Sequence, residues 1–350
     1  MNRCIYLKET EPEVTFEKQE HIISAGIGGV RMLDKGMVSD EFNNTISSLE
    51  LDFMRNSPIS IPRQFLGPGK RGSLSEKKAS KSNIHIVSAN GDFSDASLGY
   101  IKLGKPHQIP QFKIMDNVKI QIIFDQSDGD YKVQLLNFIE DLKSFEGKYN
   151  TIVDNKIQLG QVLLGKFKEK WYLGIHNQDN NPPLMEYVNK LINEKSILSE
   201  RPNYGKTHVV SGQSMVFNIE SYFRVCAKII FNFLAFSHGA DFVLQEKFDS
   251  IREWIVNGGE NKFANLIDKK NENKSMTGKI YYPDQAHKIT IIKKNNQLLG
   301  IIDFYGESFE TIVLLCDNFM EPYDINCYIC DWKNKKEYTL MEYVRFLTGR

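Results

Sequence analysis

Hydrophobic and polar residues alternate with a changing period along this chain, and each change marks an expected element. Near the N-terminus, alternation with a period of two predicts short strands at Arg3–Lys8 and Thr15–Ser24, followed by a turn at Gly26–Gly29. Apolar residues then recur every three or four positions and predict a helix at Asp40–Met54, with Asp40 as a suitable N-cap. The first unit is therefore expected to fold as two strands and a helix.

Between residues 84 and 194, short β-like runs alternate with two helical patterns. The expected strands are 84–87, 111–115, 118–124, 158–164 and 171–176, and the expected helices are 131–145 and 183–194. The last two strands are close enough in sequence to form a hairpin around Gly165–Lys170. This mixture indicates an α+β arrangement in the centre of the chain.

The most apolar stretch lies in the second half of the chain and predicts a buried helix at Glu220–Ser237, closed by Gly239. Arg224, Lys228 and Asn232 interrupt this stretch, which is too short to cross a bilayer because a spanning helix needs about 20 apolar residues. The remaining expected elements are helices at 248–256 and 339–347 and strands at 287–293, 298–305, 311–315 and 326–331. The predicted fold class is α+β: an N-terminal ββα unit, then a larger mixed region with a buried helix and a C-terminal antiparallel meander.

Composition adds two constraints. Lysine plus arginine equals aspartate plus glutamate at 44 each, so no net charge attracts nucleic acid, and such a partner would have to be held by a local patch. Five cysteines, an odd number, fit reduced thiols better than a disulfide framework, and the N-terminus lacks the apolar core of a signal peptide. We therefore expect a cytoplasmic protein that has no membrane segment.

The segment after the first helix is rich in proline, glycine, serine and basic residues. It divides the chain into a domain at 1–54, a linker at 55–83, and a region for recognition, regulation or oligomerisation at 84–350. Seven basic residues of this linker stand against the single acid Glu76: Arg55, Arg63, Lys70, Arg71, Lys77, Lys78 and Lys81. The last five are candidates for contacts with a DNA backbone, and the alternative is a solvated linker.

One ordered set of residues in the first unit carries candidate chemistry. The run Glu20-His21-Ile22-Ile23 is followed by Gly28-Gly29 and then by Asn43-Asn44. This set resembles the ββα-metal unit of HNH-type endonucleases, in which a histidine beside a carboxylate meets an amide or imidazole on the following helix. The resemblance implies hydrolysis of DNA phosphodiester bonds with one divalent cation, Mg²⁺ or Mn²⁺ or another such ion.

The resemblance also implies a role for each matching residue. His21 is the implied general base that deprotonates the attacking water, and Glu20 is an implied metal ligand or the residue that orients one. Asn43, with Asn44 beside it, is the implied metal ligand at the start of the helix. The cation would neutralise charge on the phosphate and on the leaving oxygen.

The subfamily that this chain looks most like carries C-x-x-C before E-H-I-I-P, and V-C-x-x-C-N-N after the glycine pair. Only Cys4 of the four zinc cysteines is present, and Ser24 stands in place of the proline. Leu7, Ser39 and Phe42 occupy the other cysteine positions, so one thiolate is left and a structural zinc ion is not expected. Apolar contact can replace the metal in such a knuckle, and the alternative is a decayed domain that keeps the shape without the chemistry.

Other candidate metal ligands favour a structural interpretation. Cys327-Tyr328-Ile329-Cys330 has the spacing of half a zinc site, but no second half accompanies it, and cysteines in an apolar strand are more often core residues. His85 and His287 also lie in apolar alternation and are expected to be structural.

The sequence thus predicts a metal-dependent DNA endonuclease, plausible in defence against foreign DNA, and leaves two alternatives. The first is a catalytically degenerate protein that binds nucleic acid without cutting it. The second is a ligand- or partner-sensing protein in which residues 84–350 control a nuclease output. DNA is the expected partner, and a homo-oligomer is reasonable for an enzyme that must cut both strands.

Overall fold

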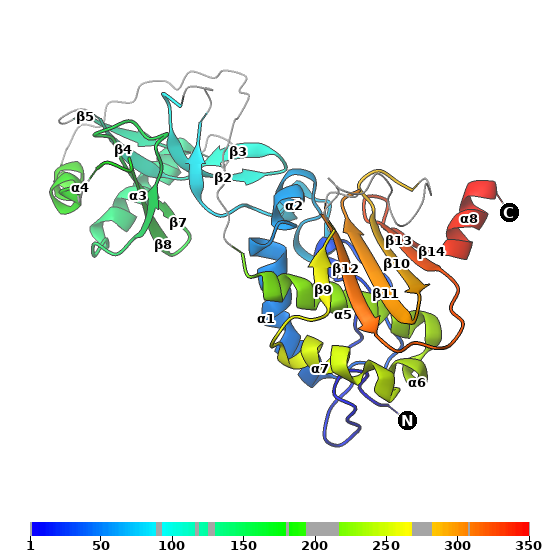
Figure 1. The fold of residues 1–350 in the computed structure, drawn as a ribbon. Helices are drawn as coiled ribbons and strands as arrows, with labels where there is room; N and C mark the ends of the chain where they lie inside the picture. Colours follow the sequence, from blue (N-terminus) through cyan, green and yellow to red (C-terminus); the bar gives the residue numbers. More distant parts are fainter. Residues whose placement is uncertain are drawn as a thin grey trace. The chain divides into compact units, whose positions relative to one another are not determined.

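The computed structural model describes residues 2–88, 93–115, 119–124, 130–179, 182–193, 217–267, 282–306 and 309–349. The chain forms two compact units. Unit 1 contains residues 1–80 and 215–350, and unit 2 contains residues 81–214. The colours of Figure 1 show that unit 1 combines the two ends of the chain, whereas unit 2 is a single stretch from its middle.

A six-stranded antiparallel sheet and one long helix form the centre of unit 1. The strands are β9 (Ala264–Leu266), β10 (His287–Lys294), β11 (Gln297–Phe304), β12 (Phe309–Cys316), β13 (Asn326–Asp331) and β14 (Lys336–Thr339). Their order in the sheet is β14-β13-β10-β11-β12-β9, so β10 to β12 form the predicted meander and β13 returns to the other side of β10. Helix α5 (Ile219–His238) lies across one face of this sheet (Figure 1).

Helix α5 is buried along almost its whole length, as its apolar sequence predicts. Every residue from Ser221 to Ala235 is buried, including the charged and polar residues that interrupt the apolar stretch. The Asn218 side chain accepts hydrogen bonds from the first backbone N–H groups, which would otherwise lack partners. None of the helices among the described residues is long and apolar enough to cross a membrane.

The N-terminal part of unit 1 contains the predicted helix but no regular strand among its described residues. Helix α1 (Asp40–Asn56) begins one residue after its N-cap, which is Ser39 and not Asp40. The expected strands are reduced to single antiparallel bridges, one of which pairs His21 with Met32. The Asp40 carboxylate instead accepts hydrogen bonds from the backbone N–H groups of Glu17 and Lys18 at 2.7 and 3.2 Å. This side chain therefore replaces part of the hydrogen bonding that a second strand would supply.

The short helical segments complete unit 1. They are η1 (Ala25–Ile27), α2 (Ser60–Leu66), η2 (Lys70–Gly72), η3 (Glu76–Lys78), α6 (Ala240–Val243), η5 (Glu246–Phe248), α7 (Asp249–Asn257) and α8 (Leu340–Thr348). Three of them lie in the segment 55–83, so the interpretation of this segment as a linker is wrong for its first 26 residues, 55–80, which belong to unit 1. Arg63 is buried there and donates to the carbonyl oxygens of Gly26 and Met54 at 2.9 and 3.2 Å.

The domain boundaries predicted from the sequence also differ from the structure. Residues 1–54 do not form a core of their own, because Cys4, Phe42 and Phe53 share one apolar cluster with α5 and the sheet. The Phe53 ring lies 5.5 Å from the ring centroids of both Tyr222 and Phe304. A hairpin and one helix bury too little apolar surface to be stable alone, and residues far along the chain supply the rest.

Unit 2 is a second α+β body with two sheets. Its elements are β1 (His85–Val87), β2 (Ser97–Lys102), β3 (Lys105–Gln108), β4 (Gln111–Met115), β5 (Lys119–Ile123), α3 (Tyr131–Lys143), β6 (Asn150–Val153), β7 (Val162–Phe167), β8 (Lys170–Ile175) and α4 (Leu184–Asn193). The sheet orders are β1-β2-β3 and β5-β4-β7-β8-β6, with β6 parallel to β8. The predicted hairpin is present as β7–β8, whereas the sequence pattern missed β2, β3 and β6.

His287 is a buried histidine whose two ring nitrogens both face backbone partners. Its Nε2 lies 2.9 Å from the carbonyl oxygen of Ile27, and its Nδ1 lies 3.2 Å from the backbone nitrogen of Tyr305. A carbonyl only accepts and an amide only donates, so the ring is neutral and carries its hydrogen on Nε2. Burial lowers the pKa of His287 to about 4, and the structural role expected from the sequence agrees with these contacts.

Protonation of His287 is expected to destabilise unit 1 in acid. The folded state lowers the pKa, so the stabilisation is complete above the ordinary value of 6.5 and is lost as the pH falls towards about 4. The difference between the ordinary pKa of 6.5 and the folded-state pKa of about 4 corresponds to about 3 kcal/mol of unfolding free energy. Urea unfolding followed by tryptophan fluorescence should show a steeper loss of stability in this range for the wild type than for His287→Gln. Equal pH dependence in the wild type, His287→Gln and the partly exposed control His176→Gln would contradict this role.

Candidate functional site

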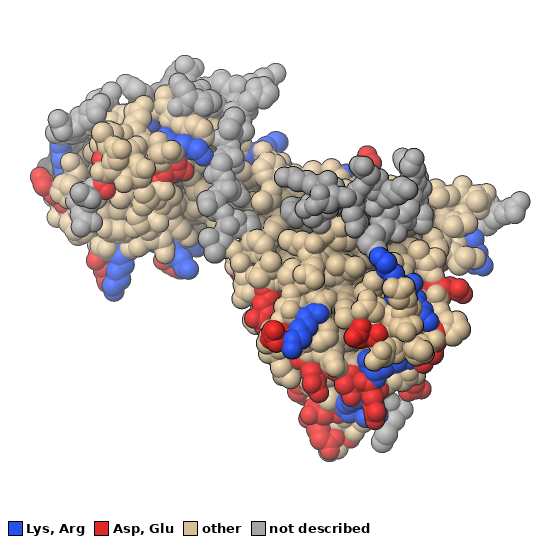
Figure 2. Space-filling view, viewed as in Figure 1, with Lys and Arg blue, Asp and Glu red and all other residues tan. Residues whose placement is uncertain are grey.

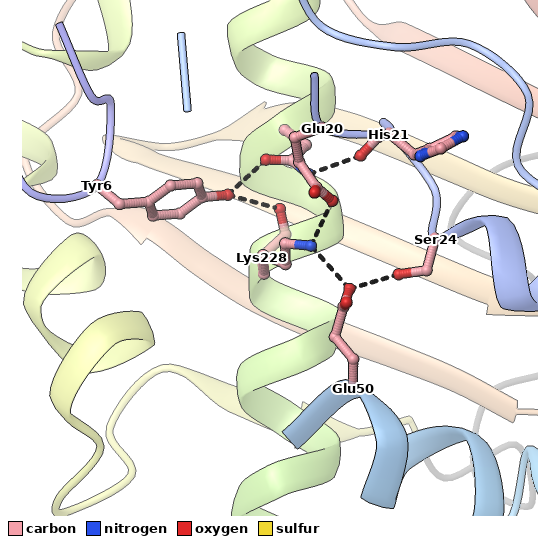
Figure 3. Close-up of polar contacts among 7 residues, drawn as sticks. Tyr6, Glu20, His21, Ser24, Glu50 and Lys228 are labelled. Atoms are coloured by element: carbon pink, nitrogen blue, oxygen red, sulfur yellow. Dashed lines mark hydrogen bonds and ion pairs between the residues drawn. The ribbon is translucent and has the colours of Figure 1, made fainter. Parts of the chain in front are cut away.

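A buried lysine of α5 joins the segment that carries the Glu20-His21 motif to helix α1 (Figure 3). The Lys228 Nζ lies 2.5 Å from Oε1 of Glu20 and 2.7 Å from Oε1 of Glu50. Only 1% of the Lys228 side chain is exposed, against 13% for Glu20 and 19% for Glu50. The Ser24 hydroxyl donates to the same Glu50 oxygen at 2.6 Å, so four side chains form one connected network.

The charges of this network do not cancel. One ammonium faces two carboxylates, which leaves a net charge of about −1 when Lys228, Glu20 and Glu50 are ionised. Burial acts to raise the pKa of Glu50, but the Lys228 ammonium and the hydrogen bonds from Lys228 and Ser24 lower it below its ordinary value. Burial acts in the opposite direction on Lys228, and the two carboxylates raise its pKa above the ordinary value. The lowered pKa of Glu50 and the raised pKa of Lys228 both favour the charged forms of these two groups.

His21 is held through its backbone. Its carbonyl oxygen accepts a hydrogen bond from Asn232 Nδ2 at 2.9 Å, and Asn232 Oδ1 in turn accepts from the Tyr6 hydroxyl at 2.5 Å. Figure 3 shows the imidazole ring turned away from the Lys228 ammonium. The ring is still close enough to Glu50 for its charge to contribute to the lowered pKa of that carboxyl. The backbone of His21 is thus held by a contact that does not involve its ring.

The segment 15–26 runs alongside α1 and brings His21 next to the helix. Glu17 bonds to Asp40 at the start of the helix, and Ser24 bonds to Glu50 ten residues later. Between these two anchors, His21 lies close enough to α1 for its charge to act on the Glu50 carboxylate.

Asn43 shares one stripe of α1 with Glu50 and Met54, because positions separated by 7 and 11 residues return to nearly the same side of a helix. Glu50 bonds to Ser24 in the segment beside α1, and an added Cβ at Gly26 would meet the Met54 side chain, so this stripe faces that segment. The Asn43 Oδ1 is buried and accepts no hydrogen bond from the residues that the structure describes. Residue 43 lies about 10 Å from residue 50 along the axis of α1, because seven residues at about 1.5 Å each separate them.

Asn44 is exposed and lies a further 100° around α1 from Asn43. The structure therefore places Asn43 on the side of α1 that faces the segment 15–26 and turns Asn44 towards solvent. Glu20, expected as a metal ligand, is bound to Lys228 through one of its oxygens.

The glycine pair after the motif allows a close turn. Gly28 has a φ of +103°, which L side chains rarely adopt, and a Cβ on Gly29 would lie 1.7 Å from the carbonyl oxygen of Ile23. The basic loop at η2 packs against this turn, since a Cβ on Gly72 would come within 2.9 Å of the Ala25 carbonyl oxygen. Lys70 and Arg71 in η2 are therefore held beside the segment that carries His21.

The predicted DNA contacts are all exposed: Lys70, Arg71, Lys77, Lys78 and Lys81. The first four belong to unit 1, and Lys81 belongs to unit 2. Acidic side chains gather instead at the end of unit 1 where the N-terminal loop lies (Figure 2), and this loop contributes the exposed Glu9, Glu11 and Glu13.

The two segments that match the zinc knuckles lie side by side. The backbone nitrogen of Ile5 donates to the carbonyl oxygen of Met37 at 2.8 Å, which joins the segment after Cys4 to the segment before Ser39. At the knuckle positions, Phe42 stacks on Tyr6 with ring centroids 3.8 Å apart. Apolar packing therefore occupies the place where the resemblance implies a zinc ion.

The donor set can be compared with the needs of a divalent cation. Among the described residues, no group of three or more His, Cys, Asp and Glu side chains has the arrangement of a metal site. Mg²⁺, however, is commonly held by one or two carboxylates and keeps several waters. The carboxylates of Glu20 and Glu50, with their excess negative charge, fit such a sparse oxygen site, whereas the Asn43 oxygen lies about 10 Å along α1 from Glu50, too far to bind the same ion.

Comparison of the chain with protein-family models, with curated proteins and with solved structures found no match. Any proposal of function therefore rests on the residues of this chain and their geometry alone. Sequence reasoning missed Tyr6, Glu50, Lys228 and Asn232 as members of the network. The available signal was the presence of Lys228 and Asn232 inside an apolar helix, since a buried charge or amide requires a partner.

Removal of the lysine should destabilise unit 1 strongly. Lys228→Met would leave Glu20 and Glu50 close together without a positive charge, and an uncompensated charge of this kind costs about 3 kcal/mol of unfolding free energy. Adding Glu20→Gln and Glu50→Gln to Lys228→Met should restore most of the stability measured by urea unfolding.

Lys247→Met is the matched control, because it removes an ion pair with the more exposed Glu321 and should cost less than about 1 kcal/mol. An equal loss of unfolding free energy in Lys228→Met and Lys247→Met would show that the buried Lys228 ion pairs stabilise unit 1 no more than an exposed ion pair does.

Proposed function

We propose that this protein is a metal-dependent nuclease that hydrolyses phosphodiester bonds of DNA. The observation that carries the proposal is the run of segment 15–26 alongside α1, with Ser24 bound to Glu50 and Glu17 bound to Asp40. It supports a site in which His21 lies next to the helix stripe of Asn43 and Glu50. The side-by-side knuckle segments support the same resemblance.

In this proposal, a ring nitrogen of His21 accepts a proton from the attacking water. The water oxygen forms the new bond to phosphorus, the bond from phosphorus to the 3′-oxygen breaks, and that oxygen finally receives a proton. The network through Asn232 fixes the backbone of His21, so its ring needs little reorganisation. Lys228 pairs with the Glu20 carboxylate and lowers the pKa of Glu50, which favours its ionised form.

Glu20 and Glu50 are the residues that would hold a divalent cation, and Asn43, which the resemblance assigns to the ion, lies about 10 Å along α1 from Glu50. When bound, such an ion supplies charge neutralisation at the phosphate and at the leaving oxygen. The basic side chains of Lys70 and Arg71 are exposed beside the glycine turn and would contact the DNA backbone without reading its sequence.

A non-catalytic nucleic-acid-binding protein is the second candidate. The 2.5 Å contact between Lys228 and Glu20 favours it, because a carboxylate committed to a buried lysine is a weaker metal ligand. In this case the network would hold the fold together, and the basic loop would bind DNA that is never cut.

Plasmid cleavage separates the two candidates. The wild type with Mg²⁺ or Mn²⁺ should nick or linearise plasmid DNA, and chelator should abolish the reaction. His21→Ala should lower the rate by about 10²-fold or more, because it removes the proton acceptor, while His176→Ala in unit 2 should leave the rate unchanged.

Glu50→Gln should raise the concentration of metal ion needed for half-maximal cleavage, because it removes one of the two carboxylates that would bind the ion. Intact plasmid under every condition, with DNA binding retained by the wild type and by His21→Ala, would reject the nuclease in favour of the binding protein.

A further inference from the structure

Three lysines of unit 2 lie directly opposite one another across neighbouring segments. Lys81 is bridged to Lys102 at the end of β2, and Lys102 is paired with Lys105 at the start of β3. Side chains that are directly opposite in antiparallel pairs point to the same face, with Cβ atoms about 5 Å apart. The three ammonium groups therefore share one face of the small sheet, and we call Lys81, Lys102, Lys105 and the nearby Lys168 the lysine row.

The backbone fixes this register. Leu103 and Gly104 form a two-residue turn between β2 and β3, and both have positive φ values, of 49° and 72°. Such a turn matches the twist of a hairpin and sets the residues on either side opposite each other. Lys102 and Lys105 are therefore held opposite each other by the turn itself.

Lys168 joins the row through an aromatic ring. The Nζ atoms of Lys81 and Lys168 each lie 5.3 Å from the centroid of the Phe167 ring. Lys81 also donates to the Tyr100 hydroxyl at 2.9 Å and lies 4.4 Å from the centre of that ring. Aromatic faces attract cations, so these two rings hold the two lysines close to each other.

The ion pairs of the described carboxylates join other groups and not this row. Within the part of the chain that the structure describes, no ion pair joins Lys81, Lys102, Lys105 or Lys168 to an aspartate or glutamate. Lys81, Lys105 and Lys168 are exposed, and Lys102 is half-exposed. Like charges directly opposite each other destabilise a sheet, so the free protein bears a cost that a bound anion would remove.

We propose that the lysine row binds the phosphate backbone of a nucleic acid. A chain of phosphates matches a row of closely spaced ammonium groups, and its binding releases condensed counterions. Tyr100 is buried and Phe167 is half-buried, so this face offers few rings for stacking with bases or for insertion into a membrane. The row therefore contacts sugar and phosphate, and its binding does not depend on base sequence.

This surface extends the DNA partner of the proposed function to unit 2, and it does not require that unit 1 cuts. Binding is therefore measured in chelator with the His21→Ala protein, by fluorescence anisotropy of labelled single-stranded and duplex DNA of about 20 nucleotides. The test variant carries Lys102→Gln, Lys105→Gln and Lys168→Gln. The matched control carries Lys132→Gln, Lys143→Gln and Lys190→Gln, three lysines of helices α3 and α4 in the same unit.

The test variant should bind single-stranded DNA on the order of 10²-fold more weakly at about 0.1 M salt, because each lost phosphate contact removes about 0.7 from the slope of log K against log salt. The slope should fall by about 2, and the control variant should match the parent protein. The thermal midpoint of the test variant should be no lower than that of the parent, since repulsion is relieved.

Several outcomes would overturn the proposal. They are no binding by the parent protein, equal affinity and slope in the parent and the test variant, and an equal loss in the control variant. Binding to vesicles of phosphatidylserine and phosphatidylcholine without binding to either DNA would also reject it. DNA binding that depends on the lysine row, without cleavage by the wild type, would reject only the proposed nuclease. Cleavage by the wild type, with DNA binding that is unchanged by the three lysine substitutions, would reject only this surface.

Discussion

The ion pairs of Lys228 are the interaction on which unit 1 depends. A lysine with 1% of its side chain exposed is stable in an apolar helix only if carboxylates meet its ammonium. Glu20 and Glu50 come from two different segments of the N-terminal region, so satisfying one buried charge fixes the motif segment and α1 against α5. The requirement for charge pairing thereby determines where three distant parts of the chain meet.

The same constraint links the fold to the candidate chemistry. Asn232 lies one helical turn after Lys228. Its Nδ2 donates a hydrogen bond to the carbonyl oxygen of His21, and its Oδ1 accepts a hydrogen bond from the Tyr6 hydroxyl. The residues that stabilise the core are therefore those that hold the backbone of the proposed base. The excess negative charge left by two carboxylates and one ammonium is also what a divalent cation requires. Stability and proposed function share one polar network.

Local patterns predicted some elements correctly and others wrongly for definable reasons. Helix α5 and helix α1 were predicted because strong apolar periodicity specifies a helix whatever packs on it. The strands expected at the N-terminus are single bridges in the structure. In the segment 15–24, the Asp40 carboxylate accepts the hydrogen bonds of the Glu17 and Lys18 backbone N–H groups that a neighbouring strand would otherwise accept. The segment 55–80 resembled a linker in composition, yet Arg63 ties it to Gly26 and Met54 through hydrogen bonds that no local pattern reveals.

The sequence by itself determined the α+β class, the buried central helix, the turn at the glycine pair and the order of the motif residues along the chain, because each follows from periodicity or residue type at short range. Only the tertiary structure decided that the first and last parts form one unit, that Glu50 and Lys228 join Glu20, and that lysines separated by more than twenty residues form one row. These relations arise from burial and charge pairing between distant segments, and such contacts leave no periodic trace in the sequence.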